Sequence, residues 1–142
     1  MIGKQFSYTA IPPFAGGMPI IIIRLSRSGR EISIPAIVDS GAALNILPYD
    51  YGLQLGFIWE EQRLMLPVGG LLLGAEAYAV SAQTAIDPFL PVNLAFAWIN
   101  KSSCEVRALL GQVNFFQCFR VAFEGYKNTF EIAPAKTQYL EK

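Results

Sequence analysis

The sequence predicts a mainly β fold in one domain, a small β-barrel with one or two short helices. Apolar, β-branched runs of strand length recur along the 142 residues, and clusters of Gly, Pro, Ser and Asn separate them. A chain of this length can bury a core of its own. No internal repeat or linker divides it, so we expect a single domain with its core over about residues 6–132 and a polar tail over 133–142.

The first third of the chain is expected to form strands joined by short turns. The isoleucine run from Ile20 to Ile23 is too short and too β-branched for a helix. The hairpin that follows returns toward Asp39. The expected elements are a strand over residues 6–11, a Pro/Gly turn over 12–17, a strand over 18–25, a loop over 26–30 and a strand over 31–38.

The remainder should alternate further strands with the short helices. Pro48 is expected to begin a helix that carries Asp50 in its first turn, near the positive end of the helix dipole. Asp87 precedes Pro88 and is expected in a turn, whereas Trp98 is expected in the core and Trp59 at the rim of the sheet. The other expected elements are strands over 77–86, 92–99, 105–110, 119–123 and 129–132, a helix over 112–118 and a turn over 124–128.

Charge and residue usage exclude several classes of function. Eleven basic and eleven acidic residues cancel, and no basic cluster is interleaved with aromatics, so nucleic-acid binding is not expected. The absence of histidine excludes Ser-His-Asp and Cys-His nucleophile systems and histidine-ligated zinc. Cys104 and Cys118 form no Cys-x-x-Cys motif. We expect them as buried thiols of a reducing compartment, with a disulfide between them as the alternative.

The chain is more apolar than most small soluble monomers. Hydrophobic residues make up 53% and charged residues 15% of it, and the mean hydropathy is +0.37. Either a partner covers apolar surface or the barrel is well filled, and composition leaves both open. Residues 5–23 carry no charge and are long enough to suggest a membrane segment. Pro12, Pro13 and Pro19 interrupt them, so we expect neither a membrane-spanning helix nor a signal peptide. We therefore expect a soluble, cytoplasmic protein.

The candidate site is a carboxylate at the end of an apolar strand. Asp39-Ser40-Gly41-Ala42 directly follows the run from Ile32 to Val38. A carboxylate placed there loses hydration, which points to a chemical role; the alternative is an ordinary Asp-Ser-Gly turn. Further along, Leu109-Leu110-Gly111 leads into the short helix expected over 112–118.

These two segments together resemble the signatures of the retropepsin-like aspartic proteases, the single-domain family that includes the retroviral enzymes. The resemblance begins at Asp39 and continues through Leu44-Asn45-Ile46-Leu47-Pro48. It implies a retropepsin-like acid-protease β-barrel with Asp39 as the catalytic residue. In that fold the active-site loop would be supported by Ser40, Gly41 and Ala42, and Leu109, Leu110 and Gly111 would pack beneath it, where a side chain at Gly111 would collide with the loop.

A glycine-rich apolar stretch between the two signatures occupies the place of the family's flap. It contains Val68, Gly69, Gly70 and Leu71, and the resemblance implies that they close over bound peptide. An ordinary hairpin is the alternative.

The implied chemistry needs two carboxylates, and the chain contains one Asp-Ser-Gly. We therefore expect a homodimer in which each chain supplies one Asp39. The resemblance also implies that Ser40 forms a hydrogen bond to the loop of the partner chain. The expected substrate is an extended peptide with apolar residues near the cleaved bond, and no cofactor or metal is implied. Because Ala42 has no hydroxyl to stabilise the charged carboxylate, activity should peak at roughly pH 5–6 rather than near pH 2.

Two other readings remain. The chain could be a non-catalytic dimeric domain of the same fold that binds peptides or acts as a scaffold, or one half of a hetero-assembly whose partner supplies the second carboxylate. Retroviral enzymes end in a single strand, whereas here a hairpin over 119–132 follows the helix. The dimer contact is therefore expected to differ from theirs.

Overall fold

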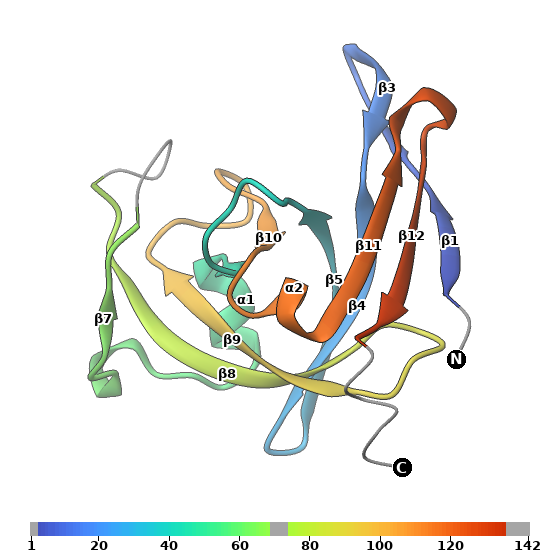
Figure 1. Cartoon of the computed structure of the whole chain (residues 1–142). Coiled ribbons are helices and arrows are strands. Elements are labelled where there is room, and N and C mark those ends of the chain that lie inside the picture. Colours follow the sequence, from blue (N-terminus) through green and yellow to red (C-terminus); the bar gives the residue numbers. More distant parts are fainter. Residues whose placement is uncertain (1–2, 69–73, 136–142) are drawn as a thin grey trace.

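The computed structural model describes residues 3–68 and 74–135 (Figure 1). Strands dominate the described chain, and its helices are short. The strands are β1 Lys4–Ser7, β2 Thr9–Ile11, β3 Phe14–Met18, β4 Ile20–Arg27, β5 Arg30–Val38, β6 Ile46–Leu47, β7 Met65–Leu66, β8 Ala77–Ala85, β9 Val92–Ile99, β10 Ala108–Leu110, β11 Phe119–Glu124 and β12 Thr129–Pro134. The α-helices are α1 Tyr49–Gln54 and α2 Phe115–Cys118, and the 3-10 helices are η1 Trp59–Glu61 and η3 Gly125–Lys127.

The largest sheet closes into a barrel. Its strands follow the order β4-β5-β10-β6-β9-β8-β7, and an additional pairing of β4 with β8 joins the ends of the ring and leaves β7 outside it. The alternating side chains of β4 and β9 place Ile23, Leu25, Leu94 and Phe96 inside, where each is almost fully buried. The predicted mainly β fold with two short helices is confirmed.

Strand β10 lies between β5 and β6 in the sheet. In the sequence, β6 follows β5 closely, whereas 69 residues separate the end of β5 from the start of β10. It runs parallel to β5, with Leu110 opposite Val38, and antiparallel to β6, with Leu109 opposite Ile46. Parallel neighbours end at the same edge of a sheet. The residues after β5, beginning with Asp39, and those after β10, beginning with Gly111, therefore meet at one end of the barrel.

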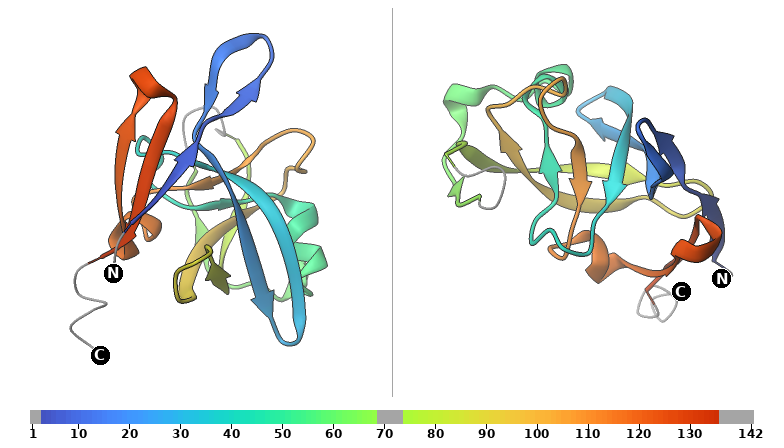
Figure 2. Two further views of the ribbon diagram at one scale, coloured as in Figure 1. Left: turned by 90° about the vertical axis from the view of Figure 1, so that its right-hand side faces the viewer. Right: turned by 90° about the horizontal axis from the view of Figure 1, so that it is seen from above.

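Two further groups of strands extend beyond this end of the barrel (Figures 1 and 2). One is the hairpin of β2 and β3, and the other is a three-stranded sheet in the order β1-β12-β11. Phe130 of β12 is fully buried and stacks on Phe6 of β1 with ring centroids 5.4 Å apart. Strands β1 and β12 are thus joined by aromatic contacts that continue the main core of the barrel.

An aromatic cluster fixes helix α1 against the barrel. Trp98 is fully buried, stacks on Tyr49 and donates its indole N–H to the Tyr49 carbonyl over 3.0 Å. Gly52 lies so close to the indole that a Cβ atom at this position would overlap the Trp98 ring. Trp98 is in the core as expected, and Trp59 contacts it edge-on.

Several element boundaries differ from those expected. The opening strand divides between β1 and β2, which belong to different sheets, and β3 begins inside the expected turn over 12–17. Pairing continues to Pro134, and Ala133 is buried, so the sheet extends into the segment expected as a polar tail. The expected strand over 105–110 and helix over 112–118 shorten to β10 and α2.

The expectation of two buried cysteines is wrong, because Cys104 is exposed with a free thiol and Cys118 is half-buried. Burial raises the pKa of the Cys118 thiol. Among the described residues, no helix is both long enough and apolar enough to cross a bilayer.

Candidate active site

Asp39 stands immediately after β5 in a turn held by backbone hydrogen bonds. Its N–H donates to the Leu110 carbonyl over 2.9 Å, and its carbonyl accepts the Ala42 N–H over 3.1 Å. The carboxylate Oδ1 accepts the Gly41 N–H over 2.9 Å. Within the described chain Oδ2 accepts no hydrogen bond. One carboxylate oxygen is therefore fixed by the loop, and the other is open to a further group.

The segment after β10 supports this turn through hydrogen bonds. The N–H groups of Gln112 and Val113 donate to the carbonyls of Ala42 and Ala43, each over 2.9 Å. The Gln112 side chain also donates to the Ser40 carbonyl over 2.7 Å. The backbone conformation of the turn is thus fixed by residues from the second signature.

Gly111 allows the two segments to approach. A Cβ atom at this position would lie 2.6 Å from the carbonyl oxygens of both Ala42 and Leu44. These are backbone atoms, so a rotamer change could not relieve the overlap. The chain needs glycine here for contact rather than for an unusual backbone dihedral.

Asn45 connects the whole arrangement, and the sequence analysis gave it no role of its own. Its side chain is fully buried, accepts the Gly111 N–H over 2.7 Å and donates to the Ala95 carbonyl over 2.8 Å and to Asn114 Oδ1 over 3.2 Å. The same Asn114 oxygen accepts the Ala95 N–H over 3.0 Å. The signal in the sequence is one polar residue within the apolar run from Ala42 to Leu47, since a buried amide needs hydrogen-bond partners.

The predicted site residues take two different positions around the barrel. Leu110 is fully buried in the main core, whereas Leu109 points to the other face and packs with Leu44, Ile46 and Val68 in a second, smaller apolar cluster. Strand alternation therefore places the two leucines on opposite faces of β10. Ser40 and Gly41 are exposed, and Ala42 is half-buried. The predicted flap residues Gly69, Gly70 and Leu71 lie outside the described residues.

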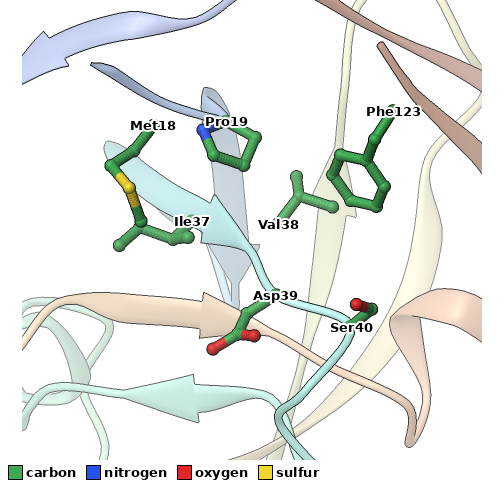
Figure 3. A pocket seen from close by; sticks show the side chains of 7 residues that line it. All are labelled: Met18, Pro19, Ile37, Val38, Asp39, Ser40 and Phe123. Atoms are coloured by element: carbon green, nitrogen blue, oxygen red, sulfur yellow. The ribbon is translucent and has the colours of Figure 1, made fainter. Parts of the chain in front are cut away.

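A shallow cavity of about 310 Å³ adjoins Asp39 (Figure 3). Its walls come from the end of β3 and the residue after it, from the end of β5 with the turn that follows, and from strand β11. The lining residues are Met18, Pro19, Ile37, Val38, Asp39, Ser40 and Phe123. Asp39 is its single ionisable residue, so among the described residues the site holds one carboxylate per chain.

The other two aspartates have structural contacts elsewhere. Burial by itself would raise the pKa of Asp50, but the Ser103 hydroxyl and N–H both donate to its carboxylate and hold that pKa below its ordinary value. Asp50 lies in the first turn of α1, as expected. Asp87 forms an exposed ion pair with Arg24 over 3.1 Å.

Comparisons with known proteins identify the fold. No protein-family model matches the chain, and no curated protein matches it. Among solved structures, the chain is similar to a retropepsin-like aspartic protease from Rickettsia conorii, with a TM-score of 0.53 and 14% sequence identity over 93% of this chain and 95% of that chain. At this sequence identity the similarity shows the fold alone. The chain has a retropepsin-like fold.

Proposed function

We propose that the protein is an aspartic endopeptidase that acts as a homodimer, with Asp39 of each chain supplying one of two carboxylates. The observation that carries this proposal is the state of the Asp39 carboxylate, whose Oδ1 is held by the Gly41 N–H while Oδ2 has no partner in the described chain. An oxygen left open at the end of a rigid loop is available to a water molecule or to a second carboxylate.

The chemistry requires two such groups. One carboxylate, ionised, takes a proton from the attacking water, while the other, protonated, donates a hydrogen bond to the carbonyl of the cleaved peptide bond. Asp39 is the single ionisable group of its cavity, so one chain holds half of the pair. A two-fold related copy is the simplest source of the other half.

Rigidity of the loop supports this role. The hydrogen bonds from Gln112 and Val113 to the loop carbonyls, and the buried Asn45 side chain behind Gly111, fix the direction of the carboxylate before any ligand arrives. Preorganisation of this kind is what a proton-transfer site needs.

The apolar side chains near Asp39 support a proposal for the substrate class. Leu109 pairs with Ile37, two residues before Asp39, and belongs to the second apolar cluster together with Leu44, Ile46 and Val68. Side chains of this type favour apolar residues near the cleaved bond and discriminate modestly among them, by about 1–3 kcal/mol per methylene. We therefore expect extended peptides with apolar residues near the cleaved bond as substrates.

Replacing the carboxylate tests the proposal. Wild type, Asp39→Asn and the control Asp87→Asn are incubated with casein and with a peptide library at several pH values, and products are identified by mass spectrometry. We expect cleavage by wild type and Asp87→Asn, and loss of at least about a thousandfold in kcat/KM for Asp39→Asn with an unchanged melting temperature. Equal activity of Asp39→Asn and wild type would overturn the proposal.

Two further outcomes separate the alternatives. If wild type and Asp39→Asn are folded, dimeric and equally inert, and both bind the same peptides, the chain is a binding domain of this fold. If sedimentation shows a strict monomer at high micromolar concentration, a self-sufficient peptidase is ruled out, and a partner of different sequence would have to supply the second carboxylate.

A further inference from the structure

Strand β11 has one free edge beside the candidate site. It pairs with β12 from Phe119 opposite Pro134 to Glu124 opposite Thr129, and it is the last strand of its sheet. Within residues 3–68 and 74–135 no other strand pairs with it. A six-residue edge strand exposes backbone N–H and C=O groups that can pair with another chain.

The two faces of β11 differ in character. Phe119, Val121 and Phe123 lie on one face, with Phe119 buried in the core and Phe123 about 40% exposed in the cavity that also contains Asp39 (Figure 3). Arg120, Ala122 and Glu124 alternate with them on the other face. The free edge therefore borders the Asp39 cavity on the apolar side and carries both signs of charge on the other.

The order of residues along β11 suits pairing with itself. Residues directly opposite each other in an antiparallel pair have side chains on the same face. A two-fold axis that relates two copies of one strand must therefore lie midway between the two copies of a single residue. An axis at Ala122 places Arg120 opposite the Glu124 of a second copy, Val121 opposite its Phe123, and Ala122 opposite its Ala122.

The neighbouring registers match less well. An axis at Val121 would place Arg120 opposite Ala122, and an axis at Phe123 would place Glu124 opposite Ala122. Neither brings opposite charges together. Arg120 has no carboxylate partner in the described part of the chain, and Glu124 has a single exposed contact with Lys127 over 3.8 Å, which contributes little. Both groups are available to a second copy.

We infer that β11 pairs antiparallel with β11 of a second copy about a two-fold axis at Ala122, which joins the two β1-β12-β11 sheets into one six-stranded sheet. The inference rests on the proposed homodimer and adds the surface that forms it. Because this axis is perpendicular to the sheet, the Val121 and Phe123 side chains of both copies lie on the same face. Both Asp39 cavities then lie over that face of the joined sheet.

Charge exchange tests the register. We expect Arg120→Glu and Glu124→Arg each to raise the dimer dissociation constant about tenfold, because each places like charges opposite each other twice per dimer. The double variant R120E/E124R should restore the wild-type value, since the charges are opposite again. Arg30→Glu makes the same charge change at the first residue of β5, at the other end of that strand from Asp39. This control should leave the dimer dissociation constant unchanged. Analytical ultracentrifugation measures all five proteins.

A crosslink tests the axis directly. In a Cys104→Ser background, Ala122→Cys should form a disulfide-linked dimer on mild oxidation, because the two substituted positions face each other. Gln83→Cys, an exposed position of β8, is the matched control and should remain unlinked.

The outcomes distinguish this inference from the proposed function. A dimeric, active wild type whose dissociation constant is unchanged in Arg120→Glu and Glu124→Arg would overturn the β11 contact and leave the peptidase proposal standing. A dimer that follows the charge-exchange pattern but cleaves nothing would support the contact and count against the peptidase. A strictly monomeric wild type would overturn both.

Discussion

The Gly111 N–H donates to the side-chain oxygen of Asn45 over 2.7 Å, across a sequence separation of 66 residues. This hydrogen bond joins the two segments that surround Asp39. It is buried, so neither partner can exchange it for water. The geometry of the site therefore depends on an amide that takes no part in the proposed chemistry.

Asn45→Ala should lower the free energy of unfolding by about 3 kcal/mol. The Gly111 N–H and the Ala95 carbonyl would both lose their side-chain partner, and each buried unsatisfied group costs about 1–3 kcal/mol. Urea unfolding followed by tryptophan fluorescence measures the change. Asn100→Ala is the control, because its side chain accepts one exposed hydrogen bond from the Glu76 N–H and should cost less than about 1 kcal/mol. Equal losses for the two variants would contradict the importance of the buried network.

Gly111→Ala should lower the free energy of unfolding by about 2–4 kcal/mol, because the added methyl group would overlap two backbone carbonyl oxygens. The turn that carries Asp39 would shift in response, and any peptidase activity should fall more than stability predicts. Gly125→Ala is the matched control, since the nearest atom to its added Cβ is 3.9 Å away. A Gly111→Ala protein as stable as the control would show that the loop accommodates the added methyl group without loss of stability.

Asp50→Asn should destabilise the protein at neutral pH and have little effect in acid. The pKa of Asp50 is lower in the folded chain than in the unfolded one, so its ionised form contributes stability above about pH 4, the unfolded value. That contribution disappears as pH falls through the lowered folded pKa. We expect a loss of about 1 kcal/mol at pH 7, allowing for solvent screening of a half-buried group.

The control for this pH dependence is Asp87→Asn, which removes an exposed ion pair and should cost less than about 0.5 kcal/mol at any pH. Chemical unfolding at a series of pH values gives both curves. A penalty for Asp50→Asn that is as large at pH 2 as at pH 7 would mean that charge is not its cause.

Ala42→Ser should move the maximum of the pH–rate profile to more acidic pH by about one unit, and wild type should peak at roughly pH 5–6. Ala42 is half-buried in the loop that begins at Asp39. A serine hydroxyl at this position could donate a hydrogen bond to a carboxylate oxygen and stabilise the ionised form of the carboxylate. Alanine has no hydroxyl and cannot make this bond. Profiles of kcat/KM for the two proteins decide the matter, and a wild-type maximum below about pH 3 would refute the expectation.

Local pattern was sufficient for much of the barrel. Strand β9 has the bounds that were expected over 92–99, because its side chains alternate between the core and the outer face. The position of Asp39 at the end of β5 followed from the apolar run before it. Strands with period-two burial and clear turn residues can be read from the sequence alone.

Long-range pairing could not be read in this way. The insertion of β10 between β5 and β6 and the hydrogen bonds of Asn45 arise from contacts between residues distant in sequence. Tyr8 lies between β1 and β2, which belong to different sheets, although the residues around it alternate continuously. Cys104 is exposed next to Ser103, which donates hydrogen bonds to Asp50, and no local pattern indicates this position.

The residues that support the Asp39 turn are synthesised long after the turn itself. Ser40 and the side chain of Gln112 that holds it are 72 residues apart, and ribosomes add roughly 5–20 residues per second. A nascent chain therefore carries the Asp39 loop for roughly 4–14 s before its support has been translated. The turn around Asp39 therefore reaches its final hydrogen bonding only after Gln112 has been synthesised.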